Sequence, residues 1–310
     1  MVAVNQALPT QTHGLVARHI ERCQHLGLAL DRFAPWTPQR GSWDLQVSIM
    51  GRRGPETPTG GAAKGPWMKD LIDTVRPDTG LIQAQRERWR QSVEERGGLI
   101  IDNLQLTSRL LVGLGASHVL ETALTLDRTS GAPIVPGSAC KGLARTYALY
   151  EVARELGIKT GEVINQDGKT RLEQLDEDLS KPDKPVEGDL APWFRAVFGT
   201  LGNAGEVCFV GGIYAGDDSP QFVVDVMTPH FPLYYRGQKA PADNDSPNPV
   251  AFLAVEAGNP FWFGLLPRRA ESAQYLEVAQ GWLIGGLTRL GAGGKTAAGY
   301  GYFALQKQGS

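Results

Sequence analysis

The stretch APIVPGSACKGLARTYALYEVARELG, residues 132–157, holds the clearest change of structure in this 310-residue chain. The prolines at its start favour extended backbone, and Ser138 stands where a side-chain oxygen can cap a helix. From Leu149 to Leu156 the apolar residues recur at i, i+3, i+4 and i+7, which places them in one buried stripe of a helix. The stretch therefore predicts extended structure that turns directly into a long amphipathic helix.

Strand-like segments surround this helix. Polar and apolar residues alternate over 103–110 and again over 119–127, which is the period of a β-strand. Further strand-like segments follow the helix at 206–214, 222–227, 250–256, 261–266 and 302–305. A second helix is predicted over 272–290, where leucines recur at helical spacing. Two helices separated by antiparallel-looking strands favour an α+β fold over a doubly wound one. The expected form is ferredoxin-like, with both helices on one face of an antiparallel sheet.

The chain is predicted to divide near residue 100. Residues 1–100 form an N-terminal helical extension, with helices expected over 11–30 and 81–96. Between these helices, residues 50–67 are rich in glycine, proline and threonine. This segment is too long for a simple connector, so it is either disordered or ordered by a partner. Residues 101–306 form the α+β domain.

The net charge of −2 hides an uneven distribution. An acidic insertion is expected at about 157–200, and residues 166–189 alone hold eight acidic and four basic side chains. The rest of the chain is then weakly basic, with a net charge of about +2. Because a few placed cations and backbone N–H groups are enough to bind phosphate, the net charge does not exclude a nucleic-acid partner.

The number of cysteines and the length of the apolar segments indicate the cellular compartment of the protein. Three cysteines without a CxxC pair argue against a disulfide scaffold and fit a reducing environment. No stretch reaches the ~18 apolar residues that a membrane-spanning helix needs. The first residues lack the basic and apolar regions of a secretory signal. We therefore expect a cytoplasmic protein with no membrane partner.

The start of the helix after Pro136 is a candidate anion site. It opens with Gly137 and Ser138. Lys141 and Arg145 follow, one turn apart on the same face. Cations beside unpaired backbone N–H groups attract phosphate, either of a nucleotide or of a nucleic-acid backbone. In the alternative, Lys141 extends along the surface and Arg145 pairs with a neighbouring carboxylate.

The loop GAGGKTAAGYG, residues 291–301, is the second candidate. Its GGKT core consists of Gly293, Gly294, Lys295 and Thr296. This core is similar to part of a phosphate-binding P-loop, but the first P-loop glycine would fall at Arg289, and the loop follows a helix instead of a strand. An NTPase is therefore disfavoured. Two interpretations remain: a backbone that approaches a ligand closely, or a glycine helix cap followed by a flexible loop.

Other residue types give weaker signals. His118 and His230 are candidates for acid–base catalysis of RNA cleavage, because histidine titrates near neutral pH, although no second base stands at a telling spacing. His19 and Cys23 offer at most two metal ligands on one helix face, whereas a structural zinc needs four. We expect no metal and no cofactor. The alternation in Phe261-Trp262-Phe263 favours core packing over stacking on bases.

Three motifs, taken in order, resemble the RAMP superfamily of CRISPR-associated proteins. The motifs are Gly113-Leu-Gly115, residues 133–145 and residues 291–301. More narrowly, three other segments resemble the sixth-subunit family of type III-B (Cmr) effector complexes. These segments are residues 118–126, 225–230 and 248–253. The similarity covers about residues 105–306, and its specificity comes from the order and separation of the motifs.

The resemblance implies a ferredoxin-like fold and a non-catalytic, RNA-binding structural subunit of an RNA-guided effector complex in antiviral defence. It implies that the subunit holds guide RNA and target RNA near the 3′ end of the guide, in contact with the repeated backbone (fourth) subunit and the first subunit. In such proteins the terminal glycine-rich loop lies near the first helix and contacts the RNA backbone. The implied RNA-binding residues are Gly137, Ser138, Lys141, Arg145, Gly293, Gly294, Lys295, Thr296, His118, His230, Arg52 and Arg53. In related complexes the target RNA is cut with an aspartate of the repeated subunit. No acid of this chain aligns with that aspartate, and Asp127 is the residue most similar to it in character.

Two other functions remain open. A RAMP endoribonuclease that processes guide RNA precursors would use His118 or His230 as acid or base, and would lose cleavage on substitution by alanine. A nucleotide-binding protein would use the GGKT loop and bind a mononucleotide saturably. The order of the motifs favours the RNA-binding subunit.

Overall fold

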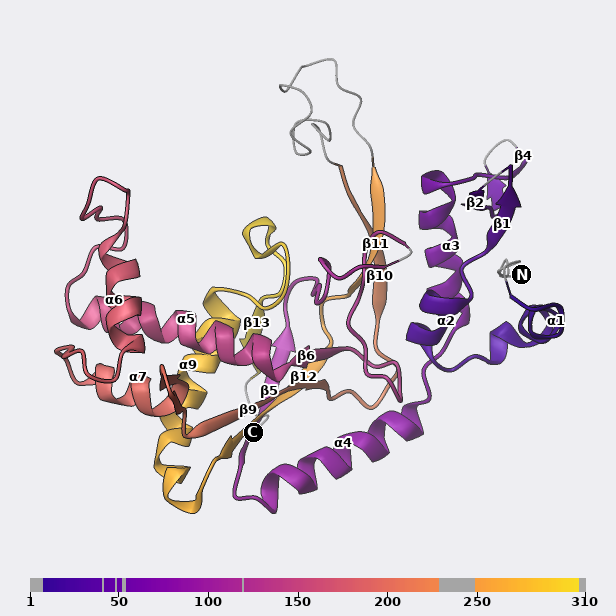
Figure 1. Ribbon diagram of the computed structural model, residues 1–310. Helices are drawn as coiled ribbons and strands as arrows, with labels where there is room; N and C mark the ends of the chain where they lie inside the picture. The colour runs from indigo at the N-terminus through magenta and orange to yellow at the C-terminus, as the bar shows by residue number, and fades with distance from the viewer. Residues whose placement is uncertain are drawn as a thin grey trace. The chain divides into compact units, whose positions relative to one another are not determined.

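The computed structural model describes residues 8–40, 42–47, 49–51, 54–118, 120–228 and 249–306. The chain forms two compact units, each assembled from three separate stretches (Figure 1). Unit 1 comprises residues 1–82, 113–133 and 218–256, and unit 2 comprises residues 83–112, 134–217 and 257–310. The units therefore interleave along the chain and do not follow the predicted division near residue 100, because two later stretches pack with the N-terminal one.

Unit 2 is built on a five-stranded antiparallel sheet. Its strands are β5 (Leu99–Leu106), β6 (Ile134–Pro136), β9 (Val207–Tyr214), β12 (Pro260–Pro267) and β13 (Phe303–Leu305). Their spatial order is β13-β5-β12-β9-β6, and every neighbouring pair is antiparallel. Helix α5 (Gly137–Glu155) lies between β5 and β9 in the chain, and α9 (Leu276–Arg289) lies between β12 and β13. With β6 as an added edge strand, this is the predicted ferredoxin-like arrangement, which the structure confirms.

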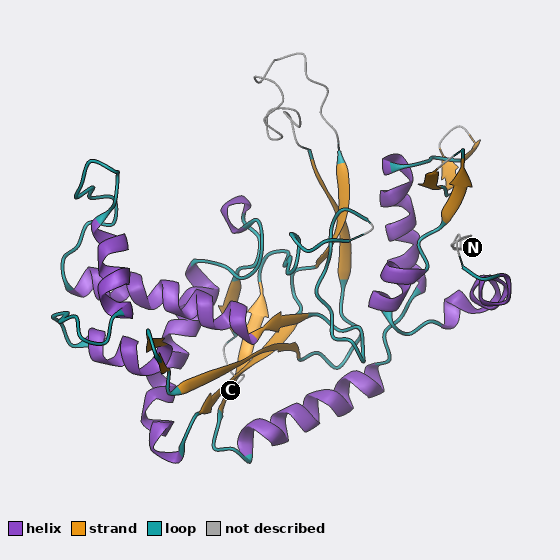
Figure 2. Cartoon of the chain, in the orientation of Figure 1, coloured by secondary structure: helices purple, strands orange, loops and turns teal. Residues whose placement is uncertain are grey.

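The two long helices of unit 2 pack against each other and against the sheet. α5 contacts β9, and α9 contacts β12 and β13 (Figure 2). Glycines allow the helices to approach closely, since a Cβ atom at Gly285 would lie 2.2 Å from the ring of Tyr147. A Cβ atom at Gly286 would lie 2.8 Å from Leu143. The 3₁₀ segment η2 (Ala270–Tyr275) leads into α9.

Helix α4 (Thr79–Glu94) begins in unit 1, and its remainder covers the opposite face of the unit 2 sheet. The Arg86 guanidinium lies 5.2 Å from the ring centre of Trp262, and a Cβ atom at Gly264 would lie 2.7 Å from Trp89. Phe261 and Phe263 alternate with these positions, so they face the other side, where both are fully buried. The prediction that these aromatic residues pack in the core is confirmed for both phenylalanines.

The acidic insertion is a folded part of unit 2. It contains α6 (Arg171–Ser180), α7 (Leu190–Phe198) and the short hairpin β7 (Gly199–Thr200) and β8 (Asn203–Ala204). α6 begins with a capping box in which the side chains of Thr170 and Glu173 each accept a hydrogen bond from the other residue's backbone N–H. Both helices contact α5 and each other. The insertion therefore forms a second layer on the outer side of α5.

Unit 1 contains short helices and two-stranded sheets around its own core. Its elements are α1 (Thr10–His19), η1 (Ile20–Arg22), α2 (Leu26–Arg32), β1 (Trp36–Gln39), β2 (Ser42–Leu45), β3 (Ile49–Gly51), β4 (Gly54–Glu56), α3 (Gly61–Thr74), β10 (Phe222–Met227) and β11 (Val250–Val255). The strands β10 and β11 form at the predicted places, but they pair with each other in a separate sheet that packs on α3. Trp67, Met68 and Leu71 of α3 supply the centre of the core.

The helix after Pro136 begins differently from the prediction. Gly137 is its first residue, Pro136 takes the cap position, and no side chain of this part of the chain caps it, so Ser138 as cap is wrong. The cause is the close approach of β9, because a Cβ atom at Gly137 would lie 2.1 Å from the carbonyl oxygen of Phe209. A strand contact, and not a hydroxyl, therefore fixes this turn.

The N-terminal predictions need two corrections. The Gly/Pro-rich segment 50–67 is not all loop, because α3 begins at Gly61. Ala63, Trp67 and Leu71 lie on one buried face, and burial of that face outweighs the glycine and proline content. The helix predicted over 11–30 is broken into α1, η1 and α2, and Nδ1 of His25 accepts the N–H of Leu28 to cap α2.

The segment 119–127 is not a strand in its described residues, which form turns and irregular backbone. A single bridge between Leu126 and Pro133 is its only strand-like pairing among them. Glu121 adopts a φ of 65°, which ends any extended run. The sequence alternates here because Leu120 and Thr122 are buried. Side-chain contacts, and not the hydrogen bonds of a β-ladder, hold the segment in place.

Candidate nucleic-acid interface

The start of α5 presents one lysine whose side chain makes no ion pair or hydrogen bond within the described chain, Lys141, on a half-buried stem. Ser138 is exposed one turn earlier, and Gly137 lies against β9. No acidic residue occupies the first turn of the helix. Lys141 and the unpaired N–H groups of this turn can therefore bind an anion together.

Arg145, one turn further along, is held by the acidic insertion. Its Nη1 lies 2.7 Å from Oδ1 of Asp176, and its Nη2 donates to Oγ of Ser180 at 3.0 Å. The guanidinium also lies 5.1 Å from the ring centre of Phe194 on α7. The sequence left two interpretations of Arg145 open, and the structure contains the pairing with a neighbouring carboxylate.

The terminal glycine-rich loop is firmly attached to the segment that follows β5. The N–H of Gly294 donates to the carbonyl oxygen of Leu111, and the N–H of Gly301 donates to that of Arg109, both at 2.7 Å. Gly293 has a φ of 80°, and a Cβ atom there would lie 2.3 Å from the oxygen of Leu111. The loop is therefore a docked structure with a defined backbone, although a short 3₁₀ turn, η3 (Thr296–Ala298), is its only regular element.

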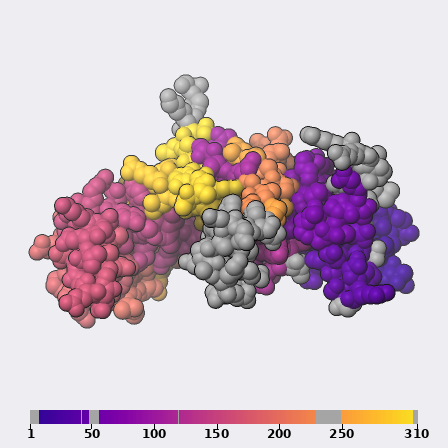
Figure 3. Space-filling view, turned by 90° about the horizontal axis from the view of Figure 1, so that it is seen from above, coloured from indigo at the N-terminus to yellow at the C-terminus, as the bar shows by residue number. Residues whose placement is uncertain are grey.

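Lys295 is a half-buried residue of this docked loop, two positions before its exposed segment 297–299. It takes the left-handed conformation with a φ of 61°, and its Nζ lies 5.7 Å from the ring centre of Tyr300. The loop reaches the surface in the space-filling view, where it is coloured yellow (Figure 3). The docked backbone therefore fixes a cation at the surface of unit 2.

Contacts between α5 and α9 connect these two cationic features. Gly286 of α9 lies against Leu143, two residues after Lys141, and the loop starts five residues after Gly286. The guanidinium of Arg289 lies 5.7 Å from the ring centre of Tyr147 on α5. Unit 2 thus carries both features on helices that pack together.

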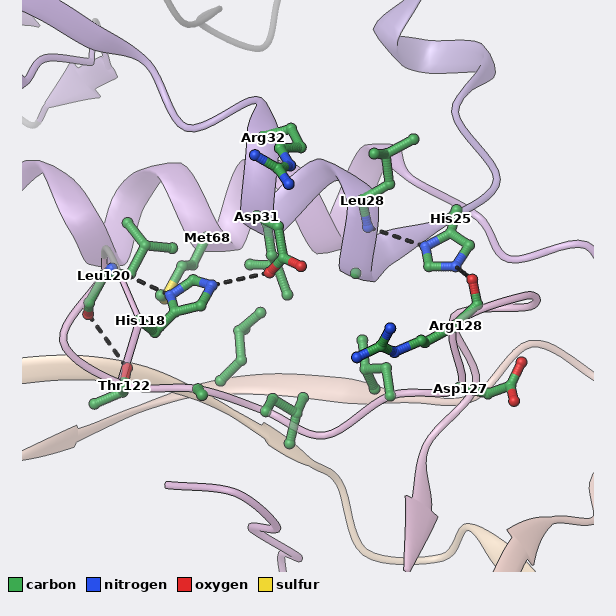
Figure 4. A pocket seen from close by; sticks show the side chains of 16 residues that line it. His25, Leu28, Asp31, Arg32, Met68, His118, Leu120, Thr122, Asp127 and Arg128 are labelled. Atoms are coloured by element: carbon green, nitrogen blue, oxygen red, sulfur yellow. Dashed lines mark hydrogen bonds and ion pairs between the residues drawn. The ribbon is translucent and has the colours of Figure 1, made fainter. Parts of the chain in front are cut away.

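His118 lies in unit 1, beside a cavity between α2 and the segment that follows residue 113 (Figure 4). Its Nδ1 accepts the N–H of Leu120 at 3.1 Å, and its Nε2 lies 2.9 Å from Oδ1 of Asp31. Because Nδ1 is an acceptor, Nε2 carries the proton and donates it to the carboxylate. Both ring nitrogens are therefore occupied, so this histidine has no nitrogen left to exchange a proton with RNA.

His25, on the same cavity, is occupied in the same way. Its Nδ1 accepts the N–H of Leu28 at 2.9 Å, and its Nε2 donates to the carbonyl oxygen of Arg128 at 2.8 Å. The two histidines therefore tie α2 to the segment around residues 118–128, and act as structural bridges across the cavity.

The cavity has a volume of about 510 Å³. Its buried wall consists of Leu30, Met68, Leu120 and Leu253. Asp31, Arg32, Asp127 and Arg128 stand around its rim (Figure 4). Sequence reasoning missed this site, because its residues come from four separate segments and no local spacing connects them.

A buried lysine of α3 also contacts the segment that follows residue 118. Lys64 of α3 is only 4% exposed, and its Nζ lies 3.4 Å from Oε2 of Glu121. Burial lowers the pKa of Lys64, and the nearby Glu121 carboxylate opposes that shift. No sequence signal marked Lys64 as buried, since lysines are rarely found inside.

The other candidate residues fall into two groups. His230, Arg52 and Arg53 lie outside the described residues. Asp127 stabilises a turn, because its Oδ1 accepts hydrogen bonds from the N–H groups of Thr129 and Ser130 and from the hydroxyl of Ser130.

The described residues contain no cluster of three or more His, Cys, Asp or Glu suited to a metal ion. Nor do they include a helix that is long and apolar enough to cross a membrane.

Comparisons with known proteins identify the family. The chain is 31% identical over 232 residues to the CRISPR system Cmr subunit Cmr6 of Pyrococcus furiosus, and the alignment covers 65% of this chain and 66% of that protein. The chain therefore spans just under two thirds of the length of this relative. A chain of the type III-B Cmr-beta complex bound to cognate target RNA is similar at 20% identity and a TM-score of 0.53, over 79% of this chain and 71% of that one.

A crystal structure of Cmr6 from Pyrococcus furiosus is 28% identical, with a TM-score of 0.40, over 67% of this chain and 99% of that one. The family model of the RAMP superfamily matches residues 103–304, well over half of the sequence. This range contains every strand and both long helices of the ferredoxin-like sheet apart from the first four residues of β5 and the last residue of β13. The chain belongs to the RAMP superfamily.

Proposed function

We propose that this protein is a non-catalytic, RNA-binding structural subunit of a type III-B Cmr effector complex. The observation that carries the proposal is the docked glycine-rich loop, which fixes Lys295 at the surface of a unit whose first long helix presents Lys141. The similarity to Cmr6 over 232 residues supports the choice of complex. The proposed partners are guide RNA, target RNA near the 3′ end of the guide, and the fourth and first Cmr subunits.

The proposed mode of binding is contact with the RNA backbone. Lysines and backbone N–H groups bind phosphates without reading sequence, so base pairing to the guide supplies specificity. The sheet offers little room for base stacking, because α5 and α9 pack on one face and Arg86 of α4 lies over the ring of Trp262 on the other. Contacts to RNA must therefore come from loops and helix ends, where Gly137, Ser138, Gly293 and Thr296 provide backbone. The N–H of Gly294 already donates to Leu111, so Gly294 would position the loop.

The chemistry of His118 supports a role without catalysis. A histidine that cuts RNA must accept or donate a proton at the ribose or at the leaving oxygen. Both nitrogens of His118 are held by Leu120 and Asp31. The nuclease alternative then depends on His230, which lies outside the described residues.

The test compares the full chain with the double variant Lys141→Ala/Lys295→Ala on a labelled single-stranded RNA, across a salt series. Each lost phosphate contact lowers the slope of log K against log salt by about 0.7, so we expect a slope shallower by about 1.4 and weaker binding. The control Lys159→Ala/Lys184→Ala removes the same charge from exposed positions of the insertion. Its binding should match that of the wild type.

The same reactions, run on a denaturing gel, test for cleavage. Intact RNA is the expected result. Cut RNA would overturn the non-catalytic role and direct attention to His230. If wild type binds no RNA at any salt concentration, the RNA-binding role is wrong. Equal slopes for both double variants would mean that the two lysines are not the contacts.

A further inference from the structure

The cavity of unit 1 has the size and the wall of a small-ligand site. Its volume of about 510 Å³ lies within the range of roughly 300 to 1,000 Å³ found for such sites. Leu30, Met68, Leu120 and Leu253 form an apolar surface, and each is less than 7% exposed. A flat apolar body can pack against this surface.

The polar groups on the rim of the cavity determine which functional groups a bound ligand can have. On the α2 side of the rim, where both histidines have their ring nitrogens occupied, the acceptor is the carboxylate of Asp31, whose side chain is 61% exposed. Oδ1 of this carboxylate accepts from His118, and within the described chain no group donates to Oδ2. Oδ2 can therefore accept a hydrogen bond from an N–H donor of a ligand.

A cation stands on the other side of the same rim. The side chain of Arg128 points into the cavity (Figure 4), and in the part of the chain that the structure describes no carboxylate pairs with it. Oδ1 of the neighbouring Asp127 accepts three hydrogen bonds from its own turn, and among the described residues no ion pair joins Asp127 to Arg128. The ligand can therefore carry an anionic group near Arg128.

We propose that the cavity binds one nucleotide of single-stranded RNA whose base carries an exocyclic amino group, such as cytosine. The base packs on the leucine wall, its amino group donates to Oδ2 of Asp31, and its phosphate lies beside Arg128. This inference rests on the proposed RNA-binding function. It adds a base-selective position, in unit 1, to the backbone contacts of unit 2.

The first test compares oligo(C) and oligo(U) of equal length as probes for the full chain. Cytosine presents an amino donor where uracil presents a carbonyl acceptor, so only cytosine bonds to the carboxylate. A hydrogen bond to a charged group is worth about tenfold in affinity, and we expect oligo(C) to bind about tenfold more tightly.

Asp31→Asn should reverse the preference. Nε2–H of His118 still requires an oxygen, so the amide oxygen of the substituted side chain faces His118 and its NH₂ group faces the cavity. That NH₂ group donates to the carbonyl of uracil and repels the amino group of cytosine. A mere loss of packing around residue 31 would weaken both probes equally and would not invert their order.

Two new variants, together with the double lysine variant used above, test whether the preference for oligo(C) arises in the cavity. Ala123→Leu fills the cavity from its lining and should abolish the preference for oligo(C), with folding checked by thermal melting. Arg128→Gln should weaken both probes and leave their ratio unchanged. Lys141→Ala/Lys295→Ala should likewise weaken both probes at constant ratio.

The outcomes separate this inference from the proposed function. If wild type binds RNA with no preference, or if Ala123→Leu keeps the preference, the nucleotide cavity is wrong while RNA binding stands. If wild type binds neither probe, the proposed function fails first. If Ala123→Leu leaves RNA binding unchanged but prevents assembly with the neighbouring subunits, the cavity takes a protein segment and the inference is overturned.

Discussion

Nη1 of Arg145 lies 2.7 Å from Oδ1 of Asp176, so the acidic insertion holds one of the two cations at the start of α5. Asp176→Asn removes the competing charge and frees the guanidinium for RNA phosphate. We expect tighter binding of single-stranded RNA and a salt slope steeper by about 0.7, measured by filter binding. Asp178→Asn, on the same helix, is the matched control and should change neither. Unchanged affinity in Asp176→Asn would mean that Arg145 serves only to hold α6.

Cys140 is predicted to be inert while the other two cysteines react. It lies in the buried face of α5, and burial raises the pKa of its thiol to about 12. The thiolate is the reactive form, so iodoacetamide at about pH 8 should modify the exposed Cys208 first and the half-buried Cys23 more slowly. Mass spectrometry of the native chain checks this order, and denaturant should expose Cys140. Equal rates at Cys140 and Cys208 would contradict the packing of α5 on the sheet.

The sequence predicted most of unit 2, because its signals are local. Alternation marks the second half of β5, strand-like segments are predicted where β9 and β12 form, and the terminal loop and the α5 start stand beside clear helical stripes. The structure of unit 1 could not be predicted in the same way. Lys64 and Glu121 lie 57 positions apart, and His118 and Asp31 lie 87 apart, so no spacing rule connects them. The strand predicted over 119–127 failed for this reason, since side-chain contacts to distant helices replace a strand partner.

The candidate site divides along the same line. Lys141 and Lys295 were predicted from glycine-rich motifs whose backbone approaches another segment closely. Such motifs can be recognised in the sequence alone. The ion pair of Arg145 was visible only as one of two alternatives, because the acidic partner is on an insertion 31 residues further along the chain. Asp31 and Arg128 gave no signal, because a cavity wall is defined by packing in three dimensions.

Lys64 should reduce the stability of unit 1 at neutral pH. Its pKa is lowered by burial from the usual 10.5, so between the lowered value and 10.5 the unfolded state binds more protons than the folded state. The free energy of unfolding therefore rises as pH increases through that window. Lys64→Met should raise stability at pH 7 by about 1 kcal/mol, because Glu121 is left exposed to water and not buried. Urea denaturation at pH 7 and 9.5 measures both effects.

Lys69→Met is the control for this substitution. Lys69 lies on the same helix, but its side chain is 62% exposed, so its removal should alter neither the stability nor the pH dependence beyond a few tenths of a kcal/mol. A Lys64→Met variant less stable than wild type by more than about 1 kcal/mol would show that the pair with Glu121 outweighs the cost of burying the ammonium group.

Gly301→Ala should detach the loop that carries Lys295. Gly301 has a φ of 78°, and a Cβ atom there would lie 1.9 Å from the carbonyl oxygen of Ala292, which is backbone and cannot rotate away. We expect a loss of about 3 kcal/mol in the free energy of unfolding, together with RNA binding as weak as that of Lys295→Ala. Gly299→Ala is the matched control, since its φ is 89° but its Cβ atom would meet open space.

Gly299→Ala should therefore cost only the left-handed strain of about 1 kcal/mol and keep its affinity for RNA. The pair separates two explanations of the loop. If Gly301→Ala loses stability but binds RNA as wild type does, the docked backbone is a structural closure of the sheet and Lys295 acts independently of it. If both variants lose RNA binding equally, flexibility of the loop, and not its docking on Arg109 and Leu111, is what RNA requires.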